Sequence, residues 1–237
     1  MAKFQLPEEG SQNTKEFKVI PTGTHVARCI SFVDIGTHEF EYQGETKSPR
    51  KVRISFETPL ETEVFNAEAG EQPFMVSTEL TLSFHEKANL FKLLSGWLGL
   101  TEENKKDFDP EKDLLGKECM ITVQHETSKK GNKFAKIMSV SPLMKGTKCP
   151  EQVNESTFFF MGYNGHSSEF DDNVFAKLPN FIQEKIMESP EYECAKAFPK
   201  AKEDDNYEEK KDKRDQEVQA EIDKDKEDLA KTVAEIF

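Results

Sequence analysis

Cysteine pairs spaced for metal binding and long apolar runs are both missing from this 237-residue chain. Its four cysteines are far apart, which argues against zinc and disulfides and fits a reducing cytoplasm; they are Cys29, Cys119, Cys149 and Cys194. No run approaches the ~18 apolar residues of a membrane span. The first residues also lack the apolar stretch of a secretory signal. We therefore expect a cytoplasmic protein with no membrane contact.

Motifs of catalytic and cofactor sites are missing as well. There is no GxxxxGK[ST] phosphate loop, no GxSxG elbow and no HExxH helix. The pair Asp171-Asp172 has no third carboxylate at a compatible spacing, so we interpret it as acidic residues near a helix N-terminus. A nuclease or polymerase would need clustered carboxylates around Mg²⁺. The sequence predicts a binding protein with no enzyme activity, no metal and no cofactor.

Three strands are predicted in the first half of the chain. Apolar and polar residues alternate there with the period of two that marks half-buried strands. The predicted strands cover 25–42 (with a bulge at 34–36), 52–57 and 76–84. Between the last two, residues 59–73 hold two prolines and several glutamates, which favours a long exposed loop.

A helix and two more strands follow. Apolar residues at three- and four-residue spacing predict a helix over 86–98, with Trp97 on its buried face. Residues 114–142 then contain two short strands joined by a tight turn at 128–133. The order strand, strand, strand, helix, strand, strand is that of the oligonucleotide/oligosaccharide-binding (OB) barrel.

We therefore predict a mainly β protein built on a five-stranded OB-fold barrel, with its helix between strands three and four. The barrel is assigned to residues 23–145 and is preceded by an arm, 1–22. A helical extension, 146–199, is expected to pack on the barrel or on a partner. Residues 200–237 form an acidic, charged tail that is partly disordered or helical.

Two basic segments fall at the loops with which such barrels bind their ligands, although the net charge is −13. Proteins that bind single strands combine a basic groove with aromatic side chains on which bases stack. The candidate phosphate contacts are Lys47, Arg50, Lys51, Arg53, Lys129, Lys130, Lys133 and Lys136. The candidate stacking residues are Phe40, Tyr42 and Phe134, and His125 is a candidate contact to a phosphate or a base. The alternative interpretation is solvated loop lysines and aromatics that pack in the core.

Several runs in the chain resemble a family of bacteriophage replication proteins. They are TGTHVAR (22–28), VDIGT (33–37), KVRISFE (51–57), LSFHEKANL (82–90), LLGK (114–117), KLP (177–179) and SPEY (189–192). The resemblance spans about residues 20–193. It implies a single-stranded-DNA-binding protein with an OB barrel, which acts in phage DNA replication or recombination in the host cytoplasm. Many members end in an acidic tail with a terminal aromatic; here the tail mixes lysines with acids.

The tail also carries a narrow apolar stripe. Its candidate contacts with replication proteins are Leu229, Val233, Ile236 and Phe237. We predict a sequence-independent single-stranded-DNA-binding protein, and leave open whether the stripe joins copies into a homo-oligomer. The rival hypothesis is a protein-interaction module on the same barrel, either a replisome scaffold or an inhibitor of a host factor, that does not bind DNA.

Overall fold

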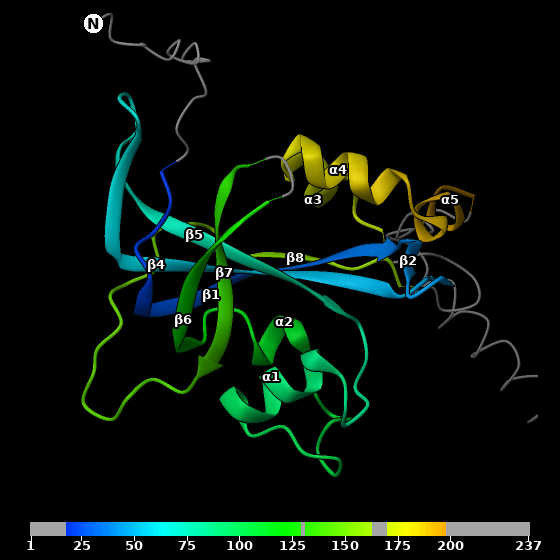
Figure 1. The fold of residues 1–237 in the computed structure, drawn as a ribbon, viewed down its shortest axis with the longest axis horizontal. Coiled ribbons are helices and arrows are strands. Elements are labelled where there is room, and N and C mark those ends of the chain that lie inside the picture. The colour runs from blue at the N-terminus through cyan, green and yellow to red at the C-terminus, as the bar shows by residue number, and fades with distance from the viewer. Residues whose placement is uncertain (1–17, 129–130, 163–169, 198–237) are drawn as a thin grey trace, which may run out of the picture.

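A strongly curled antiparallel sheet dominates the computed structural model, which describes residues 18–128, 131–162 and 170–197 (Figure 1). The strand order is β5-β4-β1-β6-β7, and the short β8 pairs in parallel with β1. The bounds are β1 (Gly23–Thr37), β4 (Arg50–Asn66), β5 (Gly70–Thr81), β6 (Glu118–Thr127), β7 (Lys133–Ser141) and β8 (Thr157–Phe159). The protein is thus mainly β, as expected.

One core lies inside the curl of the sheet, where helix α1 (Asn89–Leu98) covers it. The period-two strands and the three- and four-residue helix spacing both turn their apolar side chains inward. Phe56 of β4 meets Trp97 of α1 with ring centroids 5.6 Å apart. The indole nitrogen of Trp97 donates to the carbonyl of Glu118 at 2.9 Å, so this polar atom is satisfied. The expected core position of Trp97 is confirmed.

A second core lies on the opposite face of β1. Helices α3 (Asp172–Lys177), α4 (Asn180–Met187) and α5 (Pro190–Ala197) lie on the other side of the sheet from α1 and α2 (Pro110–Asp113) (Figure 1). Val33 and Ile35 of β1 pack there against Ile186 of α4 and Phe159 of β8. Because both of its faces are covered, β1 is buried along most of its length.

Two buried carboxylates fasten the chain after β7 to the sheet. Asp34 accepts hydrogen bonds from Arg50 Nε at 3.2 Å and from the backbone amide of Met161 at 3.1 Å. Glu57 accepts from the backbone amides of Val153 and Asn154, both at 3.0 Å. Each carboxylate is inaccessible to solvent but hydrogen-bonded, which offsets its desolvation.

The prediction of a long exposed loop over residues 59–73 was wrong. There β4 and β5 continue as a paired ribbon that rises from the body of the sheet (Figure 1). Pro59 falls at a register shift between Thr58 and Thr62, where the hydrogen-bond ladder is interrupted. Proline has no backbone N–H, and at this position no ladder hydrogen bond requires one. Phe65 and Phe74 then pack edge to face with centroids 5.1 Å apart, stabilising the ribbon.

A small hairpin replaces the predicted continuation of the first strand to Tyr42. β1 ends at Thr37, and β2 (Phe40–Tyr42) pairs with β3 (Glu45–Lys47) in a separate two-stranded sheet. The turn between them uses positive φ angles at Gln43 and Gly44, which closes a two-residue hairpin loop. Within the described residues, no helix is both long and apolar enough to cross a membrane.

The contact between Glu191 of α5 and Thr37 of β1 is sensitive to acid. Its carboxylate accepts from the backbone amide of Thr37 at 2.8 Å and from the Thr37 hydroxyl at 2.6 Å. Burial raises the pKa of Glu191, but the hydrogen bonds from Thr37 and the charge of Arg50 outweigh it, so the pKa lies below its ordinary 4.5. A carboxyl with a lowered folded-state pKa stabilises the fold above its unfolded pKa, and this is lost as pH falls through the folded value.

We therefore expect Glu191→Gln to lower the free energy of unfolding by about 1 kcal/mol at neutral pH, a value that allows for solvent screening of this partly exposed group. The difference from the wild type should shrink as pH falls below 4.5. Urea denaturation between about pH 3 and 7 measures it. A difference that stays constant over that range would contradict the assignment.

Candidate nucleic-acid interface

A groove of about 680 Å³ lies between β5 and β7, the two edge strands of the curled sheet. Residues 74–79 of β5 form one wall and residues 133–137 of β7 form the other. Arg53 of β4 and Glu126 of β6 line the groove as well, and residues 18–20 contribute the remaining lining. The groove therefore follows the open seam of the sheet.

Cations and exposed apolar side chains share this groove. The cations are Lys18, Arg53, Lys133 and Lys136, and the acids are Glu79 and Glu126. Met75 and Phe134 are 54% and 41% exposed, far more than core residues. A surface that offers positive charge beside flat or soft apolar groups suits a ligand with a charged backbone and aromatic rings.

A second hollow of about 450 Å³ continues the groove toward α4. The two share three residues of the outer sheet face: Arg53, Met75 and Ser77. Lys177 and Phe181 form its far side. The Arg53 guanidinium carbon lies 5.5 Å from the centroid of the Phe181 ring, and that ring belongs to a side chain that is 57% exposed. The helical extension thus supplies a wall of the surface.

Four of the candidate residues come together in the first groove: Arg53, Lys133, Phe134 and Lys136. Two of these cations already have intramolecular partners. Lys136 Nζ lies 2.7 Å from Glu126 Oε1, and Arg53 Nη1 lies 3.2 Å from Glu79 Oε1. Both pairs keep some contact with solvent, which limits their contribution to stability, so a polyanion can replace the carboxylates.

Four other candidates gather on and beside the β2–β3 hairpin and line neither hollow. Lys47 Nζ lies 5.0 Å from the centroid of the Tyr42 ring, and Lys51 Nζ lies 5.1 Å from that of Phe40. Both rings are more than two-fifths exposed. The structure therefore arranges these residues as two cation–π pairs, separate from the groove.

Arg50 and His125 are engaged in holding the fold together. Arg50 pairs with the buried Asp34 and donates to the Met161 carbonyl at 2.8 Å. Desolvation lowers the pKa of Arg50, but the hydrogen bond and charge of Asp34 outweigh it and the pKa is raised. His125 Nε2 hydrogen-bonds the carbonyl of Ile20 at 2.7 Å. Both contacts connect segments far apart in the sequence, which explains these residues without a ligand.

The remaining candidates lie outside the described residues. They are Lys129 and Lys130 in the turn between β6 and β7, and Leu229, Val233, Ile236 and Phe237 in the tail.

Sequence reasoning missed several residues of this surface. Lys18, Met75, Lys177 and Phe181 line the two hollows, and Lys185 of α4 reaches the same sheet face through Glu79. No local pattern could have marked them, because each contributes only through neighbours that are distant in the sequence. Phe181 of α4 is exposed, whereas Ile182 and Ile186 of the same helix are buried.

Comparison with protein-family models, curated proteins and solved structures finds no match for this chain.

Two of the four thiols, those of Cys29 and Cys119, are buried in the sheet. Burial raises the pKa of the Cys29 thiol to about 12, and the pKa of Cys119 is raised still further by its burial. Both side chains are inaccessible to solvent, as expected for cysteines that act as small apolar groups. Among the described residues, no three His, Cys, Asp or Glu side chains gather as a metal site requires.

Proposed function

We propose that this protein binds single-stranded DNA without sequence preference, across the outer face of β4 and β5. The observation that carries the proposal is the pair of joined hollows on that face. Together they expose Lys18, Arg53, Lys133, Lys136 and Lys177 beside Phe134 and Phe181. The cations attract the phosphate backbone and release its counterions, and the rings stack with bases of any identity.

We further propose that the curled sheet is an OB fold. The support is its topology: β1 pairs with both β4 and β6, and α1 lies between the third and fourth long strands of the chain. In that fold the second and third strands bind the ligand, flanked by the first and last hairpin loops. These strands correspond to β4 and β5, and the last hairpin loop to the lysine-rich turn after β6.

The proposed setting is phage DNA replication or recombination. It is supported by the resemblance of seven short runs to phage replication proteins, not by the geometry. On this proposal the tail residues Leu229, Val233, Ile236 and Phe237 recruit other replication proteins.

Fluorescence anisotropy with a labelled strand of about 30 nucleotides tests the proposal. We expect tight binding to the single strand and weaker binding to its duplex, because stacking on Phe134 and Phe181 needs unpaired bases. Raising the salt from about 50 to 200 mM should weaken binding at least tenfold, in proportion to the phosphates contacted. An RNA strand of the same sequence measures the preference between the two nucleic acids. Absence of binding to all three would reject the proposal.

A protein-interaction module is the second candidate, and one observation favours it. The β4–β5 ribbon projects from the body and exposes Leu60, Val64 and Phe65, each more than two-fifths accessible. Apolar side chains gathered on a projecting ribbon are typical of protein contacts. If Phe65→Ser abolished self-association while the protein failed to bind any strand, this candidate would replace the first.

A further inference from the structure

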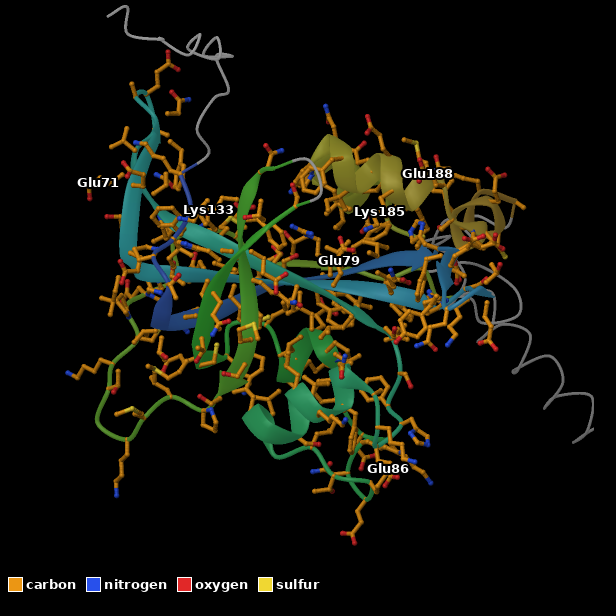
Figure 2. All side chains as sticks on the ribbon, in the orientation of Figure 1. Glu71, Glu79, Glu86, Lys133, Lys185 and Glu188 are labelled. Atoms are coloured by element: carbon orange, nitrogen blue, oxygen red, sulfur yellow. The ribbon has the colours of Figure 1, made fainter. Side chains whose placement is uncertain are left out.

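Glu79 of β5 lies beside the point where the two hollows join, and it holds two cations at once. Its Oε1 accepts from Arg53 Nη1 at 3.2 Å, and its Oε2 accepts from Lys185 Nζ at 2.6 Å. Arg53 comes from β4 and Lys185 from α4, so one carboxylate joins the sheet to the helical extension. Figure 2 shows Glu79 on the sheet, between Lys133 and Lys185 in this view.

This arrangement suits any anion that presents two oxygens. An arginine fork binds carboxylate and phosphate with the same geometry, and a lysine ammonium binds either as a point charge. Arg53 is also held in place by the Phe181 ring beneath its guanidinium, 5.5 Å from the ring centroid. The two cations therefore converge on one carboxylate, each bound to a different oxygen of Glu79, in a partly buried place.

Glu79 remains ionised in this setting. Burial raises its pKa, but the hydrogen bond and charge of Lys185, with the charge of Arg53, outweigh burial and the pKa is lowered. Its side chain is 28% exposed, and the partner side chains are 25% and 31% exposed. Neither partner is sealed from solvent, so an incoming anion can reach both.

We propose that Glu79 occupies the position of a backbone phosphate in the unbound protein, and that a bound strand displaces its carboxylate from Arg53 and Lys185. This inference rests on the proposed function and adds a regulatory contact to the same site. The exchange weakens binding, because one phosphate must compete with a carboxylate that is already paired. It also keeps α4 positioned over the sheet when no strand is bound.

The decisive variant is Glu79→Gln in the full chain. Glutamine keeps the size and the hydrogen-bonding oxygen of the side chain but removes its charge. We expect the affinity for a strand of about 30 nucleotides to rise about tenfold near 50 mM salt, because two cations become available to phosphate. The plot of log affinity against log salt should become steeper by about 0.7, the contribution of one single-strand phosphate contact.

Two controls separate this effect from a general change in charge. Glu102→Gln alters the net charge equally, but Glu102 pairs with Lys105 and lines neither hollow. The Glu102→Gln protein should therefore bind the strand with the affinity of the wild type. In an Arg53→Met/Lys185→Met background, Glu79→Gln should have no effect on binding, because the cations it would release are gone. This completes a mutant cycle that isolates the coupling.

The outcomes are distinct. If the wild type binds with salt sensitivity but Glu79→Gln is no tighter, the inference is overturned and the proposed function stands. Equal tightening by Glu102→Gln, or tightening by Glu79→Gln in the methionine background, overturns it too. If neither the wild type nor Glu79→Gln binds any strand, the proposed function fails and the inference fails with it.

Discussion

Replacing Lys129, Lys130 and Lys133 together by alanine should weaken binding to a single strand by about 10- to 100-fold near 50 mM salt. Lys129 and Lys130 fall in the sequence between β6 and β7, and Lys133 begins β7 and lines the groove. Each lost phosphate contact removes about 0.7 from the slope of log affinity against log salt, so the slope should become shallower by about 2. Anisotropy titrations at several salt concentrations measure both quantities.

The matched control is a triple alanine variant of Lys87, Lys92 and Lys106. These three lysines are exposed: Lys92 lies in α1, Lys87 precedes it, and Lys106 lies between α1 and α2. Both helices lie on the other side of the sheet from α4 (Figure 1). The variant changes the net charge by the same amount but should bind like the wild type. If both triple variants lost affinity equally, binding would depend on overall charge and not on the groove.

Asp34→Ala should lower the free energy of unfolding by about 3–5 kcal/mol, the typical cost of breaking a buried ion pair. The substitution leaves Arg50 beside a cavity without its carboxylate, and it leaves the backbone amide of Met161 without its acceptor. Both losses fall where the chain leading to α3 leaves the sheet. Chemical denaturation monitored by circular dichroism gives the change.

Asp109→Ala provides the comparison for this prediction. Asp109 also combines an ion pair, with Lys112, and a backbone contact, because its carboxylate caps α2 by accepting from the amide of Glu111. It is partly exposed, so its loss should lower the free energy of unfolding by much less than the loss of Asp34. If Asp34→Ala were no more costly than Asp109→Ala, the buried pair would not fasten the extension as described.

Sequence patterns located the core of this fold because its strands and its main helix are amphipathic. The alternation of Val52, Ile54 and Phe56 has one explanation, a strand with one face buried, and the structure places all three in the core. The ribbon over 59–73 was missed because proline and glutamate are signals for loops. Pro59 is compatible with a strand here because it lies at a register shift. That shift depends on the partner strand, so the local sequence does not reveal it.

The candidate surface was less predictable, because charge in the sequence does not reveal its partner. Arg50 and Arg53 belong to one basic run, yet one pairs with a buried carboxylate and the other opens onto a groove. The difference comes from Asp34 on the neighbouring strand. The wall formed by Phe181 was equally hidden, because its contact with Arg53 exists only after α4 has packed on β1.

The position of β1 between two cores has a consequence for how the molecule comes apart. Phe32 belongs to the core under α1, and the next residue, Val33, belongs to the core under α4. Neither core can melt without removing one face of the strand that the other requires, so the two layers form one cooperative unit. The sheet is therefore supported from both sides, and losing either layer of helices would expose a face of β1.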